Sequence, residues 1–250
     1  MWKNWTIPVV EGFFNKAGLI DNSPLLAYLT NVAAQSEDFK RRTILQTANV
    51  NTGEVTIFNQ DNLDWKDVAK AAVASASIPT VFPPFIWDDG RLFMDGGTIR
   101  NVNTLSAIEQ CKQLVDDESK ITVDVMVCTS PNQADPITED PSNTIGWWWR
   151  SRSLSDGYSG SNIYKQDMVA HPDVNWRYMA WQTGAHAGGI SEIEFDGDKT
   201  WPLQEQGRVD AQALLAAGEN THVELFNNWY DSKDLKDQYP TFGSLLEALQ

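Results

Sequence analysis

Apolar and polar positions along the chain follow two spacings, which predict a mixture of helices and strands. Apolar residues recur at helical spacing in five segments. Short runs rich in β-branched and aromatic residues, bounded by turn residues, indicate strands. The predicted helices are 25–32, 65–76, 105–115, 208–217 and 243–249, and the predicted strands are 43–50, 55–58, 91–94, 121–128, 176–181 and 190–195. Strands alternating with helices that are apolar on one face are typical of an α/β layer fold.

Several local signals support these boundaries. Pro24 stands in the first turn of the first helix, after a polar Asp-Asn-Ser run. Asp64 is the expected N-cap of the second helix, and Pro79 ends it. Residues 129–146, rich in Pro, Asp, Ser and Asn, are expected to form a long loop.

Composition and charge narrow the function classes. The 250 residues are 42% hydrophobic and 21% charged, which is typical of a globular protein, and the net charge is −15. Nucleic acid is therefore not an expected partner, and electrostatic docking on an anionic membrane is disfavoured. No apolar run spans a bilayer, and the first residues lack the apolar stretch of a secretory signal. A cytoplasmic or peripheral membrane location is expected.

The cysteines and histidines add little chemistry. Cys111 and Cys128 lack metal-ligand spacing and are too few for a disulfide framework, so both are expected to be small buried side chains. The three histidines are widely spaced, which gives no support for a Ser-His-Asp triad. Asp196-Gly197-Asp198 is interpreted as a turn, since a calcium loop needs further ligands. No metal site is predicted.

The most informative stretch runs from Ala74 to Pro84 and continues, eleven residues on, at Asp95-Gly96-Gly97. It predicts a helix that ends in a proline-rich loop, followed by a short strand that carries a carboxylate onto a Gly-Gly turn. Paired glycines allow a sharp turn and a close approach to the backbone. An aspartate at the C-terminal end of a strand suits a functional site of an α/β fold. The alternative is an aspartate that only caps a helix or closes a tight turn.

This stretch resembles the patatin-like phospholipase family, in which an alanine- and serine-rich helix end and an F-P-P loop precede a D-G-G turn. Further similarities follow the family's order: the G-L-x-D-x-x-P-L stretch at 18–25, the T-A-N-V-N-T-G stretch at 47–53, and Asn101-Val102 after the D-G-G. The resemblance covers about Gly12 to Cys128. It implies a three-layer α/β/α sheet that is incomplete at its N-terminus. Residues 1–130 would form this α/β core without its first β-α units, and residues 131–250 a C-terminal extension of the same domain.

The resemblance also implies a Ser–Asp dyad that hydrolyses carboxylic esters of phospholipids or acylglycerols without a cofactor. Asp95 would be the base, Gly96 and Gly97 its supporting turn, and the site would be lined by Ser77, Pro79, Phe82 and Pro83. The family's G-x-S-x-G serine and glycine-rich oxyanion loop, which would precede Gly18, do not occur in the sequence. We therefore expect a truncated or split lipid acyl hydrolase, whose serine comes from a missing N-terminal segment or an oligomer partner.

Two alternatives stay open. The chain is either such a hydrolase or an inactive patatin-like protein that binds lipid or another partner. Ser159, within Gly157–Ser161, is another candidate nucleophile, but the sequence around it predicts a flexible Gly/Ser loop instead. Ser75 and Ser77 end a helix and are interpreted as caps and packing contacts. The Trp147-Trp148-Trp149 run suits either peripheral contact with a membrane or packing within the protein.

Overall fold

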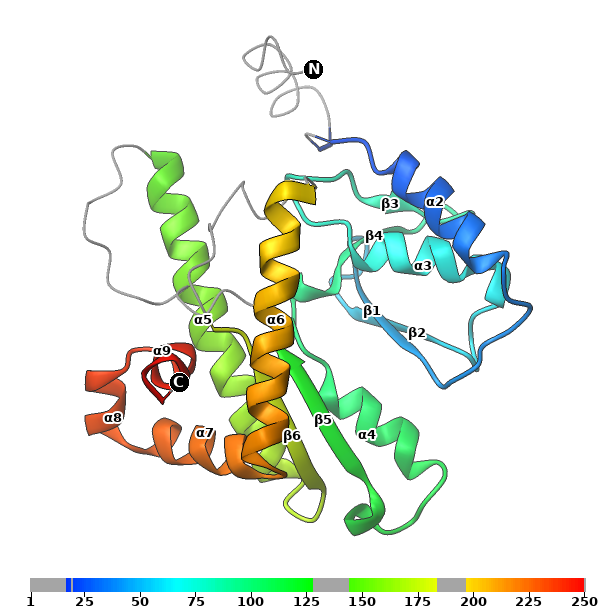
Figure 1. Cartoon of the computed structure of the whole chain (residues 1–250). Coiled ribbons are helices and arrows are strands. Elements are labelled where there is room, and N and C mark those ends of the chain that lie inside the picture. The colour runs from blue at the N-terminus through cyan, green and yellow to red at the C-terminus, as the bar shows by residue number, and fades with distance from the viewer. Residues whose placement is uncertain (1–16, 19, 128–143, 184–196, 250) are drawn as a thin grey trace. The chain divides into compact units, whose positions relative to one another are not determined.

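The computed structural model describes residues 17–18, 20–127, 144–183 and 197–249, and the chain divides into two compact units (Figure 1). The units are residues 1–110 and 111–250. Strands and helices alternate along both, which confirms the α/β class. The boundary falls inside a helix and precedes the predicted division at residue 130. That residues 131–250 extend the same domain stays a prediction.

The first unit contains a four-stranded antiparallel sheet in the order β2-β1-β4-β3. The strands are β1 (Ile44–Asn49), β2 (Val55–Asn59), β3 (Phe85–Ile86) and β4 (Leu92–Asp95). The predicted hairpin and the strand before the D-G-G turn are thus confirmed. The sequence analysis missed β3, because two residues directly after two prolines give no strand pattern.

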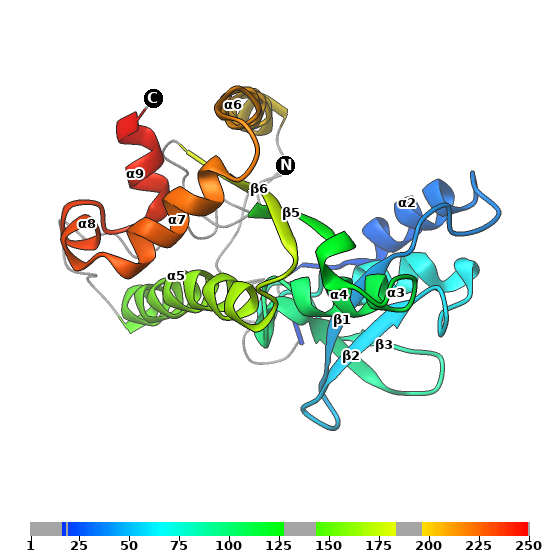
Figure 2. The ribbon, with the colours of Figure 1, turned by 90° about the horizontal axis from the view of Figure 1, so that it is seen from below.

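Helices cover this sheet. They are α2 (Ser23–Ala33), the short η1 (Trp65–Asp67), α3 (Val68–Ser75), η2 (Gly96–Thr98) and α4 (Thr104–Lys112). The predicted cap is confirmed, since the Asp64 side chain accepts a hydrogen bond from the Lys66 N–H group. Helix α3 packs on β1 and β4, and α2 lies beside α3 (Figures 1 and 2).

The hydrophobic core of the first unit lies between α3 and the sheet. Ala71, Ala74 and Phe93 are almost fully buried there, with Phe58 and Leu63 beside them. Phe58 stacks on Trp87, with their ring centroids 4.8 Å apart, and meets Phe93 edge-on at 5.4 Å. The small side chains of α3 allow this helix to approach the aromatic layer closely.

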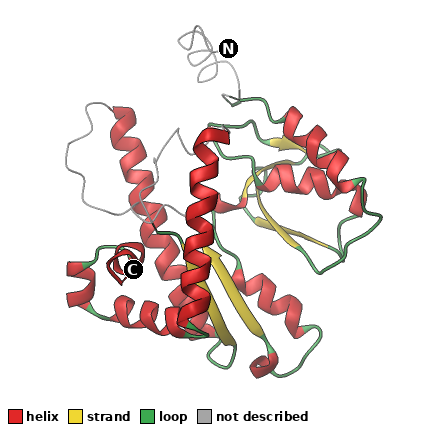
Figure 3. Cartoon of the chain, in the orientation of Figure 1, coloured by secondary structure: helices red, strands yellow, loops and turns green. Residues whose placement is uncertain are grey.

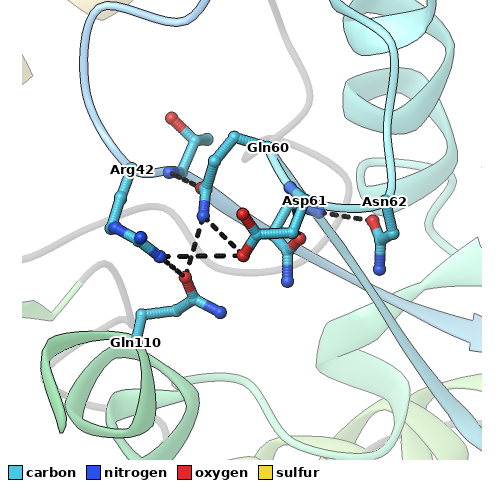
Figure 4. A network of polar contacts seen from close by, with 7 residues as sticks. Arg42, Gln60, Asp61, Asn62 and Gln110 are labelled. Carbon is cyan, nitrogen blue, oxygen red and sulfur yellow. Dashed lines mark hydrogen bonds and ion pairs between the residues drawn. The ribbon is translucent and has the colours of Figure 1, made fainter. Parts of the chain in front are cut away.

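A polar network joins the end of α4 to the β1–β2 side of the same unit (Figure 4). The Gln110 Oε1 atom accepts hydrogen bonds from the Arg42 guanidinium at 2.8 Å and from the Gln60 amide at 2.9 Å. Gln60 also bonds Asp61, whose carboxylate lies 3.6 Å from Arg42. Together with the fully buried Ile108, this network fixes α4 after the D-G-G turn.

The second unit is a β-α-β arrangement with further helices. Strands β5 (Thr122–Val127) and β6 (Asn175–Trp181) are parallel and lie side by side (Figure 3). The long helix α5 (Thr144–Ala170) lies between them in the sequence. Helices α6 (Gly197–Ala217) and α7 (Thr221–Asp231) pack on β6, and α7 also contacts α8 (Lys233–Gln238) and α9 (Phe242–Leu249). A short η3 (Glu118–Lys120) precedes β5.

An aromatic cluster forms the core of the second unit. Trp181 from the end of β6 stacks on Phe226 of α7 at 6.0 Å and meets Phe242 of α9 edge-on at 5.5 Å. Tyr164 of α5 and Trp229 of α7 complete it, and all five side chains are buried. The cluster therefore joins one strand to three helices.

An ion pair joins the two parallel strands at a shift in their register. Val123 pairs with Trp176 and Asp124 with Tyr178, so Arg177 is an extra residue in β6. Its guanidinium donates two hydrogen bonds to the Asp124 carboxylate, at 3.0 and 2.5 Å. These bonds lower the pKa of Asp124, because they stabilise its charged form.

Five predictions from the sequence are wrong. Residues 144–146 and 157–161 belong to α5 rather than to loops, and α6 begins eleven residues before the predicted 208. Leu114 is 66% exposed rather than part of the α4 core, since α4 ends at Lys112. Cys111 is exposed rather than buried.

Two expectations lie outside the described residues, namely the strand at 190–195 and the environment of Cys128. No helix within the described ranges has both the length and the apolar character that crossing a membrane requires.

Replacing Asp124 with Asn tests the ion pair. The folded-state pKa of Asp124 lies below its unfolded value, so the pair stabilises the fold above about pH 4 and the contribution disappears as the pH falls below that. Asp124→Asn should lower the free energy of unfolding in urea at pH 7 by less than about 1 kcal/mol, because the pair is partly exposed. The difference in the free energy of unfolding between Asp124→Asn and wild type should shrink towards pH 3.

The matched control is Asp173→Asn, at an exposed position before β6. A difference between Asp124→Asn and wild type that is as large at pH 3 as at pH 7 would contradict a stabilising ion pair between Asp124 and Arg177.

Candidate functional site

Asp95 ends β4, and three contacts fix its backbone and side chain. Its N–H group donates to the Ser77 carbonyl at 2.9 Å, and its backbone pairs with Thr47 of β1. Its Oδ1 atom accepts a hydrogen bond from the Gly97 N–H group at 2.7 Å and thereby caps η2. The side chain is half-buried. Asp95 thus closes its own turn, as the structural alternative expected, while its carboxylate stays at the end of a central strand.

Gly96 allows this turn to lie against β1. A Cβ atom on this buried residue would lie 2.7 Å from the Gln46 carbonyl carbon, which belongs to the backbone of the neighbouring strand. The Gln46 amide donates to the carbonyls of Gly96, at 2.9 Å, and of Arg100, at 2.7 Å. One side chain of β1 therefore bonds both ends of the turn that follows Asp95.

Gly97 stands between two polar side chains. A Cβ atom there would lie 3.0 Å from the Asn101 Oδ1 atom and 3.1 Å from the Asp95 Oδ1 atom. These neighbours are side-chain atoms rather than backbone. The two glycines of the turn are consequently not equivalent, since the first is restricted by a strand and the second by groups that can rotate.

Ser77 connects three elements behind the turn. It is 1% exposed, and its hydroxyl donates to the Val73 carbonyl of α3 at 2.8 Å and accepts from the Asn22 amide at 3.2 Å. Its own carbonyl receives the Asp95 N–H group. The sequence analysis expected Ser77 to line the site. Its burial and its bond to the Asp95 backbone make Ser77 a residue that positions Asp95, and its role in lining the site stays a prediction.

The proline-rich loop runs alongside the stretch that begins at Gly18. A Cβ atom on Gly18 would lie 2.8 Å from the Pro83 ring, and the Ile20 N–H group donates to the Val81 carbonyl at 2.8 Å. Phe82 is buried, whereas Pro79 and Pro83 are half-buried. The motifs at 18–25, 47–53, 74–84 and 95–97, dispersed in the sequence, therefore meet around one turn.

Thr80 is the strained residue of this loop. Its φ angle is +71°, in the left-handed region that β-branched residues rarely adopt. The N–H groups of Val81 and Phe82 both donate to the Ile78 carbonyl, which closes the loop around it. Strain of this kind is common near functional sites and is maintained by the surrounding packing.

The sequence analysis missed Asn22, Gln46 and Thr80 as parts of this arrangement. Asn22 was interpreted only as a helix-start residue and Gln46 only as a strand residue. The Gln46 Oε1 atom is buried and has no hydrogen-bond partner among the described residues. The long polar side chain in the middle of β1 was the available signal for Gln46. The hydrogen bond of Asn22 to a residue far along the chain left no signal in the sequence.

Ser159 lies on α5, in the second unit, and is exposed. The sequence predicted a flexible loop there, and this prediction is wrong because residues 157–161 are helical. A helix interior does not provide the strand-to-helix turn that exposes the nucleophile of a G-x-S-x-G elbow.

The remaining candidate groups lie in the second unit. His171 Nδ1 lies 3.1 Å from Glu118, whose pKa is lowered by Lys112 and by His171. Burial lowers the pKa of His222, on α7. Trp147 is 51% exposed, and the choice between membrane contact and packing for the Trp147–Trp149 run stays open. No group of three His, Cys, Asp or Glu side chains within the described part of the chain is arranged to hold a metal ion.

Gly96→Ala and Gly97→Ala form a matched pair of variants. We expect Gly96→Ala to lower the free energy of unfolding by about 2–3 kcal/mol, because the new methyl group meets the β1 backbone. Gly97→Ala should cost less, about 1 kcal/mol, since Asn101 can move. Urea denaturation measures both. Equal losses for the two variants would show that β1 does not restrict the turn.

Replacing Thr80 with Gly should relieve strain. The left-handed conformation costs a residue with a Cβ atom about 1–2 kcal/mol, and the extra freedom of glycine in the unfolded chain offsets about 0.5–1 kcal/mol of that gain. Thr80→Gly should therefore raise the free energy of unfolding by about 0.5–1 kcal/mol. Thr80→Ala, which retains a Cβ atom, should show no such gain in stability. If Thr80→Ala gained as much stability as Thr80→Gly, relief of backbone strain could not be the cause of the gain.

Comparisons with known proteins agree with this geometry. Residues 2–108 match the family described as patatin-like phospholipase, and this range includes every residue of the turn and the proline-rich loop. No curated protein and no solved structure matches the chain. Residues 2–108 of this chain are thus similar to the patatin-like phospholipase family.

Proposed function

We propose that this chain takes part in the hydrolysis of carboxylic esters of phospholipids or acylglycerols, with Asp95 as the general base. The main support is the position of Asp95 at the end of β4, inside the family segment, with its backbone bonded to Ser77. A carboxylate fixed in this way can receive a proton without first losing conformational freedom.

The proposed reaction uses two groups. Asp95 accepts the proton of a serine hydroxyl while the serine oxygen bonds to the ester carbonyl carbon, and the alcohol leaves with that proton. Water then cleaves the acyl-serine, and Asp95 takes and returns the proton in the same way. The scheme needs no metal or organic cofactor.

The serine of this scheme is not Ser159. The 250 residues contain no G-x-S-x-G, and Ser159 lies on an exposed helix. We propose that a G-x-S-x-G segment outside these residues, encoded upstream or carried by another polypeptide, supplies the nucleophile. The proposed lining of the site remains Ser77, Pro79, Phe82 and Pro83, and Gly96 and Gly97 remain its supporting turn.

The absence of G-x-S-x-G also favours a second candidate function. The chain would then be an inactive member of the family that binds lipid or another partner through the same scaffold. The two candidates differ in one property, since only a hydrolase turns over an ester when the serine segment is present.

Asp95→Asn tests the base in the longest product of the reading frame that contains these residues. We expect its kcat on a p-nitrophenyl acyl ester to fall about 10²- to 10⁴-fold, because a positioned base contributes a factor of that size. Asp89→Asn is the matched control, since Asp89 is an exposed aspartate whose bonds are to Arg91 only two residues away.

Three results would decide against the proposal. They are turnover that survives Asp95→Asn, turnover abolished by Ser159→Ala, and a folded product without any turnover in a frame that encodes a G-x-S-x-G. The last result would favour the inactive lipid-binding protein.

A further inference from the structure

Helix α2 differs from the other α-helices that the structure describes, because it contains no charged residue and no buried one. From Asn22 to Ser36 the sequence has no Asp, Glu, Lys, Arg or His, although the whole chain has a net charge of −15. None of the residues of α2 is buried. An exposed helix of a globular protein usually carries charged residues on its outer face, so the composition of α2 requires another explanation.

The apolar residues of α2 form two adjoining faces. Leu26, Leu29 and Ala33 are half-buried and spaced for the side that lies against the unit, where α2 packs on α3. Leu25, Tyr28 and Val32 form a second stripe along the helix, at spacings of three and four residues. Their side chains are 37%, 65% and 44% exposed. We call these three residues the outer stripe.

The helix is anchored at both ends, so the outer stripe is a fixed feature of the surface. At its start, the Asn22 amide bonds Ser77. At its end, the Trp65 indole N–H donates to the carbonyls of Ala33 and Ser36, at 3.0 and 2.9 Å. Helix α2 also lies on the outside of its unit, next to α3 (Figure 1).

The outer stripe belongs to a helix whose first residues are linked to the candidate site through Asn22 and Ser77. Leu25 follows Asn22 by three residues, and Asn22 contacts the serine whose carbonyl holds the Asp95 backbone. An apolar surface that starts at this place suits a substrate presented in an aggregate, such as a lipid bilayer. Tyr28 adds an aromatic side chain with a polar tip, which is favoured at the boundary between lipid and water.

The net charge of the protein indicates which kind of lipid surface the outer stripe would bind. A protein with a net charge of −15 is repelled by anionic lipids, and α2 carries no cation to overcome this repulsion. An uncharged, apolar stripe matches a zwitterionic or neutral surface.

We propose that the outer stripe of α2 inserts into the surface of a zwitterionic lipid aggregate and brings the Asp95 turn to it, an inference that rests on the proposed lipid-ester function. The occupant is the lipid surface itself, and a second copy of this chain is the competing outcome.

The experiment measures sedimentation of the purified 250-residue chain with phosphatidylcholine vesicles. We expect Tyr28→Asp and Val32→Asp each to lower the partition coefficient about tenfold or more, because a charge then enters the lipid surface. Ile86→Asp is the matched control, since Ile86 is 67% exposed in the same unit but lies on β3. It should bind as the wild type does. Adding phosphatidylserine to the vesicles should weaken wild-type binding at low salt.

Three results would overturn the inference. They are no binding by the wild type, equal losses for the α2 and β3 variants, and a dimer in solution that Tyr28→Asp dissociates without changing vesicle binding. Thermal melts confirm folding, and Tyr28→Ser replaces any variant that does not fold.

Hydrolysis of a soluble acyl ester tests the proposed function without testing the role of α2, because this substrate forms no lipid surface. In the longest product of the reading frame, Asp95→Asn should reduce hydrolysis of the soluble ester about 10²- to 10⁴-fold and leave vesicle binding unchanged. Vesicle binding that depends on the outer stripe, without any hydrolysis of the ester, would reject the proposed function but not the role of α2 in binding. Hydrolysis without stripe-dependent binding would reject only the role of α2.

Discussion

The arrangement of the first unit depends on one backbone hydrogen bond, from the Asp95 N–H group to the Ser77 carbonyl at 2.9 Å. It joins the end of a central strand to the loop that follows α3. Because the Ser77 side chain also bonds α3 and Asn22 of α2, movement of any of these elements would be transmitted to the carboxylate. The close approach of Gly96 to β1 restricts the turn from the other side. A carboxylate constrained on both sides is suited to catalysis, where small displacements of a reacting group reduce the rate strongly.

Much of this fold could be predicted from the sequence because its signals are local. The cap at Asp64, the proline in the first turn of α2, and the β-branched runs of β1, β2 and β5 each act within a few residues. The aspartate and paired glycines after β4 also formed a local signal, and the surrounding motifs indicated the family. These parts of the fold therefore agree with the prediction.

The errors have physical causes that local patterns do not contain. Helix α5 includes a Ser- and Gly-rich segment of low helix propensity, and tertiary packing of residues such as Tyr164 outweighs that preference. The role of Ser77 depends on a bond to a residue 55 positions away, which no spacing rule reveals. Thr80 adopts a conformation that its own side chain disfavours, so a threonine at this position argues against the turn that the chain makes there.

The central claim is that Asp95 activates a serine of a G-x-S-x-G segment. Its most direct test is covalent labelling of the longest in-frame product with a fluorophosphonate, which reacts only with an activated hydroxyl, followed by mass spectrometry of the modified peptide. The account predicts one labelled serine, within a G-x-S-x-G sequence, whose rate of labelling falls sharply in Asp95→Asn and not in Asp89→Asn. Labelling at Ser159, or labelling at the same rate in both variants, would contradict it.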